Sequence, residues 1–158
     1  MGVRFGWEPI ARLIAEPNAP DLLQEHYAAL GVYKDKLKLH VAWEHLAAAE
    51  AAGNFRIWAA RDDDLLVGYL GLWIIRHGHF EGTVLAVEDS FLLSAPYRKG
   101  WTGIRMLKEA VEALREMGVD LVIIHEKVHF AEERGGLGKI YRRLGFDHVD
   151  NLWSKMLR

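Results

Sequence analysis

The sequence predicts a single mixed α/β domain covering residues 1–158, with a central β-sheet flanked by helices. Its length fits one domain with a buried core. Helical spacing of apolar residues dominates the first third, and segments rich in branched and aromatic residues follow. A long amphipathic helix then separates two strand-like segments. This order is typical of an α/β domain in which a helix crosses over between two neighbouring strands.

The first third predicts one strand followed by three helices. The strand is GVRFG, and the first helix is WEPIARLIAE, where the proline is tolerated in the first turn. The following PNAP breaks this helix, and Asp21 is expected to cap a second helix that ends at Gly31. An alanine-rich third helix is expected within residues 40–53.

Three β-strands are predicted in the middle of the chain. FRIWAA (55–60), LLVGYLGLWIIRH (65–77) and TVLAVEDSFLL (83–93) are rich in residues that favour strands, and polar or glycine segments separate them. The RDDD connection is expected to be a solvated hairpin turn without chemistry.

The last third predicts a loop, a long helix, a strand, a short helix and a final strand. The long helix follows the loop SAPYRKGWTG (94–103), VDLVII is a compact apolar strand, and Gly145 ends the short helix within GLGKIYRRLGF. The tail NLWSKML alternates like a last strand. The long helix carries an apolar stripe of four residues: Ile104, Leu107, Val111 and Leu114.

Composition excludes several functional classes. The formal net charge of −2 and the pI near 6.4 give no global basic field that would attract nucleic acid or an anionic membrane. The chain has no cysteine, which excludes disulfides, thiolate metal sites and a cysteine nucleophile. The N-terminus lacks a signal-peptide pattern, and no apolar run is long enough to cross a bilayer. We therefore expect a cytoplasmic protein without a membrane partner.

The segment 84–107 places a strand, a glycine-containing loop and a helix in succession. Arg98, Lys99, Gly100 and Gly103 lie in the loop. Backbone N–H groups at a helix N-terminus, helped by cationic side chains, bind anions such as phosphate. The loop has neither the G-K-[ST] ending of a Walker loop nor the G-x-G-x-x-G dinucleotide pattern. Glycine also serves in ordinary strand-to-helix turns, so both interpretations stay open.

Two stretches resemble the GNAT superfamily of acetyl-coenzyme A-dependent N-acetyltransferases, and the element order is similar over nearly the whole chain. EDSFLLSAPYRKGWTGIRMLKEAVEALREMG is similar to the family's fourth strand, its R/Q-x-x-G-x-G/A pyrophosphate loop and its following helix. IYRRLGF is similar to the family's tyrosine-bearing segment. One position departs from the pattern, because Trp101 stands where the first loop glycine is expected and Gly100 lies one residue early. The R-x-G-x-x-G form looks like the variant found in GNAT proteins of phages.

The resemblance implies how the acyl donor, acetyl-coenzyme A, would bind. In this family the fourth and fifth strands splay apart, and the pantetheine arm pairs with the free edge of the fourth strand, here around Phe91, Leu92 and Leu93. A backbone N–H at that edge would also polarise the thioester carbonyl. No metal is expected. The pyrophosphate loop corresponds to six residues: Arg98, Lys99, Gly100, Trp101, Thr102 and Gly103.

Glu88, Asp89 and Tyr141 are the candidates for acid–base chemistry. An amine must lose its ammonium proton before it attacks a thioester, and a carboxylate on the fourth strand suits that task. Strict alternation places Asp89 on the face of Phe91 and Glu88 on the face of Leu92. Glu88 lies nearer the position that the family uses and is the preferred base, while the family's proton donor for the thiolate maps to Tyr141. The alternatives are a salt-bridged carboxylate and a core tyrosine whose hydroxyl reaches solvent.

The stretch HEKVH (125–129) fits the zinc-binding H-E-x-x-H pattern. That pattern needs both histidines on one helix face, whereas VDLVII directly before it predicts a strand, on which the two positions would lie roughly 13 Å apart. A metal-dependent hydrolase is therefore the weaker alternative. Under the GNAT resemblance, His125, Glu126 and His129 become candidates for acceptor binding or proton relay, and solvated loop residues are the alternative.

The sequence favours an N-acetyltransferase that moves an acetyl or small acyl group to a primary amine by direct attack in a ternary complex. A GNAT-like module that binds acyl-coenzyme A or a partner protein without catalysis is the alternative. The acceptor is expected to be a small-molecule or peptide amine, and the acidic balance argues against nucleic acid. The sequence leaves open a homodimer formed through the C-terminal strand. Six residues are candidate acceptor contacts: Trp7, His26, Tyr27, Tyr33, His77 and Glu126.

Overall fold

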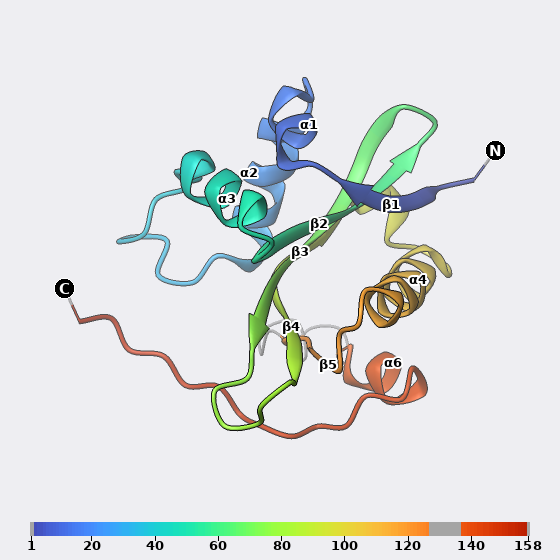
Figure 1. Ribbon diagram of the computed structural model, residues 1–158. Coiled ribbons are helices and arrows are strands. Elements are labelled where there is room, and N and C mark those ends of the chain that lie inside the picture. The colour runs from blue at the N-terminus through green and yellow to red at the C-terminus, as the bar shows by residue number, and fades with distance from the viewer. Residues whose placement is uncertain (1, 127–136, 158) are drawn as a thin grey trace.

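The computed structural model describes residues 2–126 and 137–157 and contains one five-stranded β-sheet. Its strands are β1 (Arg4–Glu8), β2 (Phe55–Asp62), β3 (Leu65–Arg76), β4 (Val84–Leu93) and β5 (Leu121–Ile123). They lie across the sheet in chain order (Figure 1). The first four strands pair antiparallel, and β5 runs parallel to β4, which makes the sheet mixed as predicted.

Helices cover both faces of the sheet. They are α1 (Ile10–Ala15), α2 (Ala19–Leu30), α3 (Trp43–Ala51), α4 (Thr102–Glu116) and α6 (Gly138–Arg143), with a short 3-10 helix, η1 (Ala95–Tyr97), before α4. The first three lie on one face, and α4 and α6 lie on the other (Figure 1). Within the described ranges, no helix combines the length and the apolar character needed to cross a bilayer.

The predicted crossover helix is confirmed. β4 and β5 pair in parallel at three positions, Leu85 to Val87 against Leu121 to Ile123, and α4 connects them. Gly118 follows the helix with a φ of 82°, a left-handed conformation typical of the residue after a helix C-terminus.

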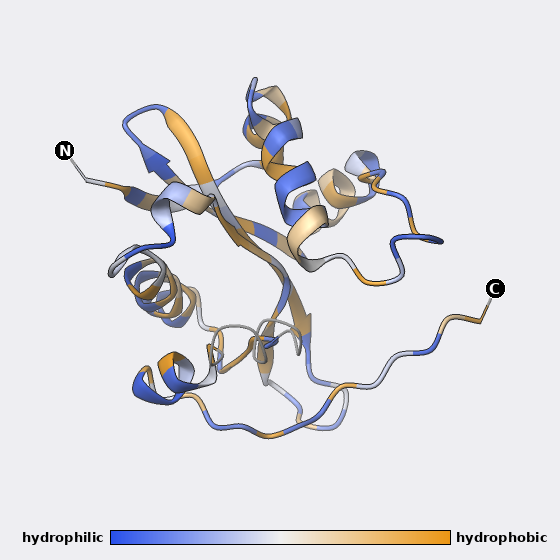
Figure 2. Cartoon of the chain, turned by 180° about the vertical axis from the view of Figure 1, so that it is seen from behind, coloured by the Kyte–Doolittle hydropathy of each residue, from blue (hydrophilic) through white to orange (hydrophobic). Residues whose placement is uncertain are grey.

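An apolar core packs on each face of the sheet, so that hydrophobic strand segments lie between the helical layers (Figure 2). One core joins β3 and β4 to α4 and α6, and the other joins β2 and β3 to α1, α2 and α3. The buried residues of α4 are Met106, Leu107, Ala110 and Leu114. The predicted stripe is therefore correct for Leu107 and Leu114, whereas Ile104 and Val111 are only half-buried because the packed face is rotated toward Met106.

The RDDD connection includes a buried ion-pair network as well as the predicted turn. Asp63 has a φ of 50° in the turn. Arg61 is buried at the end of β2, where its guanidinium donates to Glu8 at 2.6 Å and to Glu16 at 2.6 Å. Burial of an arginine is tolerated because both partners are carboxylates. This network ties β2 to β1 and to the end of α1.

Two predicted features are wrong. Asp21 does not cap α2, because the helix begins at Ala19 with Pro20 in its first turn, and Asp21 lies inside that turn. Residues 147–157 form no strand, although NLWSKML alternates like one. A strand needs a hydrogen-bonded neighbour, and no described segment pairs with the tail. Its apolar side chains, such as Trp153, are therefore exposed.

Candidate active site

A β-bulge in β4 sets the directions of the two candidate carboxylates. The register with β3 shifts between Gly71 and Leu72, so that Ser90 lies opposite Gly71 and Glu88 lies opposite Leu72. Asp89 therefore has no partner in the register. Gly71 permits this close approach, because a Cβ there would lie 2.6 Å from Ser90 Oγ. Bulges redirect side chains and are frequent beside active sites.

The bulge reverses the predicted alternation toward the end of β4. Leu92 packs in the core of α1 and α2, whereas Phe91 and Leu93 pack in the core of α4 and α6. The prediction that Phe91 shares a face with Asp89 is wrong, because one extra residue in the strand turns every later side chain to the other face. Glu88 and Asp89 still face opposite sides of the sheet.

Glu88 lies buried on the face covered by α4 and α6, with 6% exposure. Its Oε2 accepts the backbone N–H of His125 at 2.6 Å and lies 3.5 Å from His125 Nδ1. His125 comes two residues after the end of β5, so this carboxylate connects β4 to the backbone that follows β5. A buried carboxylate needs such hydrogen bonds to be stable. Glu88 is therefore engaged by the protein itself.

Tyr141 lies on α6 with 8% exposure, and its hydroxyl has no hydrogen-bond partner among the described residues. The alternative of a hydroxyl that reaches solvent is wrong, because the oxygen is buried. Burial raises the pKa of Tyr141, and the negative charges of Glu88 and Glu126 raise it further. The hydroxyl thus keeps its proton at neutral pH. Asn18 Oδ1 and Trp58 Nε1 are likewise buried without a partner among the described residues, and contact with a ligand is one explanation for such a group.

His125 and Glu126 follow β5 without helical structure, which confirms for these two residues that HEKVH does not begin a helix. Glu126 Oε1 accepts the backbone N–H of Gly138 at 2.8 Å, at the first residue of α6. Its carboxylate therefore caps a helix N-terminus, where negative charge is favourable. His129 lies outside the described residues. Among those described, no three His, Cys, Asp or Glu side chains gather in a way that could hold a metal ion.

One edge of β4 extends beyond β5. Pairing between the two strands ends at Val87, whereas β4 continues along β3 to Leu93. In the part of the chain that the structure describes, residues 88–93 therefore have no partner from β5. A free strand edge can pair with the main-chain-like amides of an extended ligand. The predicted pantetheine edge lies in this stretch: Phe91, Leu92 and Leu93.

Arg98 anchors the loop after β4 to α2. Its Nε donates to the carbonyl of Leu93 at 2.6 Å, and its guanidinium forms an ion pair with Glu25 of α2. Glu25 Oε1 also accepts the backbone N–H of Ala95 at 3.1 Å. The predicted phosphate-binding arginine is thus turned toward α2 and toward the end of β4.

The other loop residues lead into the N-terminus of α4. Gly100 has a φ of 77°, which favours glycine, and a Cβ there would meet no atom within 4 Å. Lys99 and Trp101 are exposed. Thr102 and Gly103 are the first residues of α4, so their N–H groups belong to the first turn that has no intrahelical partner. The loop therefore presents a cation and a helix N-terminus together.

The other face of β4 carries a second polar group. Asp89 is exposed, and its Oδ1 accepts the indole N–H of Trp73 at 3.0 Å. Tyr69 is buried and shares a hydrogen bond of 2.7 Å with Nδ1 of His26 on α2. Burial raises the pKa of Tyr69, and the charges of Asp89 and Glu25 raise it further. Asp89 thus acts electrostatically on the same hydroxyl that bonds His26.

Sequence reasoning identified only part of this second group. His26 is among the predicted acceptor contacts, whereas Tyr69 and Trp73 look like ordinary strand residues. No motif joins His26 to Tyr69, because 43 residues separate them. An aromatic residue with a polar atom inside a strand is the only available signal, and core tyrosines share it.

The other predicted acceptor contacts lie in separate places. Trp7 packs against Trp58 with ring centroids 4.8 Å apart, and His77 accepts the N–H of His79 in the turn between β3 and β4. Tyr27 donates to the carbonyl of Leu37. Tyr33 donates to the carbonyl of Ser154 in the tail.

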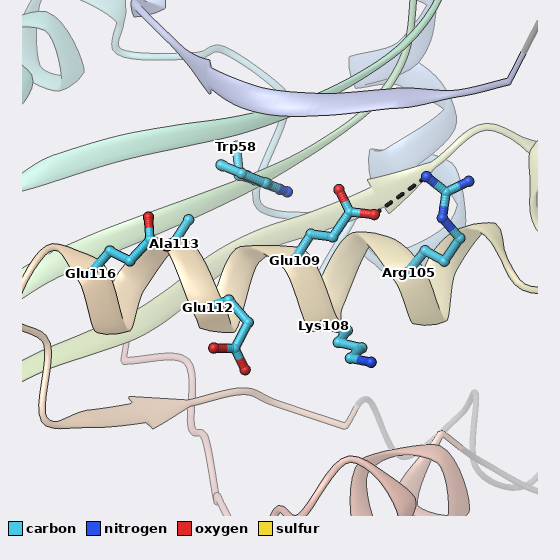
Figure 3. Close-up of a pocket in the computed structure, with 7 residues that line it drawn as sticks. All are labelled: Trp58, Arg105, Lys108, Glu109, Glu112, Ala113 and Glu116. Atoms are coloured by element: carbon cyan, nitrogen blue, oxygen red, sulfur yellow. Dashed lines mark hydrogen bonds and ion pairs between the residues drawn. The ribbon is translucent and has the colours of Figure 1, made fainter.

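An open hollow of about 520 Å³ lies along α4 (Figure 3). Arg105 and Glu109 form an ion pair of 3.3 Å there, one turn apart on the helix. The hollow has the character of a solvated helix face, and none of the predicted site residues lines it. Its lining residues are Trp58, Arg105, Lys108, Glu109, Glu112, Ala113 and Glu116.

No family model matches the sequence, and no curated protein matches it. Solved structures do resemble the whole chain. An aminoglycoside acetyltransferase from an uncultured soil metagenomic sample, in complex with sisomicin, has a TM-score of 0.73 at 14% identity, covering 99% of this chain and 97% of that one. Glucosamine-6-phosphate N-acetyltransferase from Arabidopsis thaliana has a TM-score of 0.71 at 12% identity, with both chains covered completely (100%).

A third structure agrees with these two. Ribosomal-protein-alanine N-acetyltransferase from Brucella melitensis biovar Abortus has a TM-score of 0.69 at 16% identity, covering 100% of this chain and 99% of that one. At such identities the likeness concerns the fold. The chain has the fold of the GNAT acetyltransferases, as the resemblance of its strand, loop and helix segment implied.

Proposed function

We propose that the protein transfers an acetyl or small acyl group from coenzyme A to a primary amine, by direct attack in a ternary complex. The observation that carries this proposal is the buried hydroxyl of Tyr141, which has no partner among the described residues. The charge of Glu88 helps to raise its pKa, and Glu88 lies one residue past the last pair between β4 and β5. The compared structures are named as acetyltransferases, and two of them as N-acetyltransferases, which supports acyl transfer to nitrogen.

The residues present fit acyl-coenzyme A. The free edge of β4 from 88 to 93 would pair with the amides of the pantetheine arm. The N–H groups of Thr102 and Gly103 would bind the pyrophosphate, with Lys99 adding positive charge and the left-handed Gly100 keeping the loop open. Arg98 would act by holding this loop against α2.

Coenzyme A supplies an activated acyl carbon when its thioester is bound. Tyr141 would hold a proton for the departing sulfur, because burial and two carboxylates keep its hydroxyl un-ionised. Glu88 would keep His125, and with it the segment after β5, in position beside Tyr141. Proximity of the bound amine to the acyl carbon would provide much of the rate.

Calorimetric titration with acetyl-coenzyme A, followed by thiol release in the presence of primary amines, tests the proposal. We expect Tyr141→Phe to lower kcat by about 100-fold or more while the Kd for acetyl-coenzyme A stays the same. Tyr97→Phe is the matched control, because it removes a hydroxyl that donates to Asp62 at 2.8 Å and that has no part in the proposed reaction. Absence of acetyl-coenzyme A binding in the wild type would refute the proposal.

A non-catalytic acyl-coenzyme A-binding module is the second candidate. The engagement of Glu88 by His125 and of Arg98 by Glu25 favours it, since both side chains already serve the fold. The same experiment decides between the two, because such a module would bind acetyl-coenzyme A and release no thiol with any amine.

A further inference from the structure

We infer that Glu126 is a positioning residue of the proposed reaction, and that it places the Tyr141 hydroxyl by holding the N-terminus of α6. The inference rests on the proposed function, in which Tyr141 supplies the proton for the departing sulfur. It gives Glu126 a role through another residue, in place of the acceptor contact or proton relay that the sequence suggests. Gly138 is the second member of the pair, because its backbone N–H is the group that Glu126 holds.

The helix α6 depends on this contact for its attachment. It has six residues, and a helix of that length is not stable by itself in water. Among the described residues, one hydrogen bond joins α6 to another part of the chain, and it runs from the Gly138 N–H to Glu126 Oε1 at 2.8 Å. The other attachment is apolar packing, in which Tyr141 is the buried residue of the helix. Loss of the Glu126 contact therefore leaves the helix to be placed by packing alone.

Two successive hydrogen bonds connect β4 to α6. Glu88 Oε2 accepts the N–H of His125 at 2.6 Å, and Glu126, the next residue, accepts the N–H of Gly138. Tyr141 follows Gly138 by three residues, which is nearly one turn of the helix. The strand with the free edge and the helix with the tyrosine are thus joined through one short segment after β5.

The space around Gly138 matches the Glu126 carboxylate. A Cβ at this position would lie 2.9 Å from Glu126 Oε2. The backbone of Gly138 is helical, and glycine is not among the residues that favour a helix. The close approach of Glu126 is therefore the reason that the structure offers for a glycine at the first residue of α6.

Glu126 also acts on the Tyr141 hydroxyl through its charge. Burial raises the pKa of Tyr141 most, and the charges of Glu88 on β4 and of Glu126 raise it further. His125 is the other titratable group beside them, with its Nδ1 3.5 Å from Glu88 Oε2. The position and the proton affinity of the hydroxyl thus both respond to Glu126, and two substitutions can separate these effects.

The pKa of Tyr141 can be measured without any acyl transfer. Ultraviolet absorbance titration of each protein, compared with the same protein carrying Tyr141→Phe, isolates the ionisation of this hydroxyl. We expect Glu126→Gln to lower the pKa of Tyr141, because it removes the charge and keeps an acceptor oxygen. Glu126→Ala should lower it further, because α6 also loses its anchor and water reaches the hydroxyl. An equal pKa in wild type and Glu126→Ala would overturn the inference.

Kinetics test whether Glu126 affects the chemical step. The acceptor is tyramine or butylamine, whichever releases thiol faster, with acetyl-coenzyme A saturating. We expect Glu126→Ala to lower kcat by about 10-fold or more while the KM for the amine changes by less than about twofold. Glu126→Gln should keep kcat near that of wild type, because its amide oxygen can accept the same N–H. A raised KM with unchanged kcat would mean that Glu126 contacts the acceptor, and would overturn the inference.

The control for these measurements is Glu116→Ala. It removes an exposed carboxylate at the C-terminal end of α4, outside the proposed site. We expect neither kcat nor the pKa of Tyr141 to change in this variant. Equal effects of Glu116→Ala and Glu126→Ala would reduce the role of Glu126 to general surface charge and would overturn the inference.

A double-mutant cycle tests whether Glu126 acts through Tyr141. In a protein that already carries Tyr141→Phe, we expect Glu126→Ala to lower kcat by less than about twofold. Equal losses in the two backgrounds would overturn the inference. Gly138→Ala is an independent variant, because alanine favours a helix and its Cβ displaces the Glu126 carboxylate. It should lower kcat in the same direction as Glu126→Ala, and a wild-type kcat in both variants would contradict the inference.

The outcomes separate the two proposals. If wild type transfers no acyl group but Glu126→Ala lowers the pKa of Tyr141 more than Glu126→Gln does, the proposed function fails while the placement of Tyr141 by Glu126 stands. If wild type transfers acyl groups and Glu126→Ala changes neither kcat nor the pKa of Tyr141, the function stands and the inference about Glu126 fails.

Discussion

The two faces of β4 use neighbouring carboxylates in different ways. Glu88 is buried, accepts a backbone N–H from the segment after β5 and acts on the buried Tyr141. Asp89 is exposed, accepts the indole N–H of Trp73 and acts on the buried Tyr69. Each face thus pairs one carboxylate with one tyrosine whose pKa is raised.

This difference shows that two neighbouring carboxylates of one strand can have different environments beside a bulge. Burial demands that Glu88 be hydrogen-bonded, and the protein meets that demand with its own backbone. The bulge gives Asp89 a place outside the regular register, where no described cation neutralises it. We therefore expect changes on the Glu88 face to affect stability more than changes at Asp89.

The largest expected effect on stability is at Leu72, which lies opposite Glu88 and is fully buried, at 0% exposure. Leu72→Ala leaves a cavity beneath the Glu88 face and should lower the free energy of unfolding by about 3 kcal/mol. Urea denaturation followed by circular dichroism measures it. Leu65→Ala, at an exposed position of the same strand, is the control and should change stability by less than about 0.5 kcal/mol. Equal losses would mean that the Glu88 face is not tightly packed.

The direct comparison of the two carboxylates should give the next largest effect. Glu88→Ala leaves the N–H of His125 without its acceptor and should lower the free energy of unfolding by about 1–3 kcal/mol. Asp89→Ala leaves only a half-exposed indole N–H, which water can satisfy, so its loss should stay below about 0.5 kcal/mol. Urea midpoints at constant m value provide the measurement. A larger loss for Asp89→Ala would reverse the assignment of the two faces.

High pH should destabilise the protein through both tyrosines. Their folded pKa values are raised above the unfolded value of about 10, so their contribution to stability is complete below pH 10. Above it the unfolded state loses these protons first, and stability falls by up to about 1.4 kcal/mol per pH unit for each tyrosine until its folded pKa is reached. Urea denaturation between pH 9 and 11 tests the sign, and the double Tyr69→Phe, Tyr141→Phe variant should flatten the decline.

The pKa of each tyrosine should respond to the carboxylate on the same face of β4. Asp89→Asn should lower the pKa of Tyr69 and leave that of Tyr141 unchanged, and Glu88→Gln should do the reverse, because a carboxylate acts most strongly on the nearest hydroxyl. Absorbance titration near 295 nm, with each variant also carrying one Tyr→Phe change, separates the two signals. If either variant moved both pKa values equally, the two faces would not be electrically independent.

The smallest effect on stability is expected at the ion pair between Arg98, in the loop after β4, and Glu25 of α2. Arg98→Ala removes a partly exposed ion pair with Glu25, so the free energy of unfolding should fall by less than about 1 kcal/mol. Arg115→Ala, which breaks a more exposed pair with Glu112, is the control and should have less effect. The thermal midpoint of each variant measures it, and a loss above that of Glu88→Ala would contradict the ranking.

The elements were predictable where local signals act alone. Hydrophobic periodicity identified every strand of the sheet and α4, and Gly31 and Gly145 mark helix ends in the expected places. The loop between β4 and α4 and the tyrosine of α6 were identified by their resemblance to a known pattern. Asp21 failed as a cap because Pro20 already suits the first turn, and two competing local signals leave a boundary uncertain by a few residues.

The site was less predictable, because it depends on pairing between distant segments. Alternation assigned the faces of Glu88 and Asp89 correctly and those of Phe91 and Leu93 wrongly. The reason is that the bulge depends on Gly71 of β3, and the sequence of β4 alone does not predict it. Arg98 was expected to meet phosphate, and its tie to Glu25 follows only from the packing of α2 beside the loop.

The sequence by itself determined the mixed α/β fold and the crossover helix, and it singled out Glu88, Asp89 and Tyr141 as candidate site residues. Those features depend on periodicity and chemistry within short stretches of chain. Only the tertiary structure decided which carboxylate is buried, which tyrosine each one influences, and that the tail does not complete the sheet. The physical reason is that burial, register and hydrogen-bond partners are set by contacts between residues far apart in the chain, such as Glu88 with His125 and Tyr69 with His26.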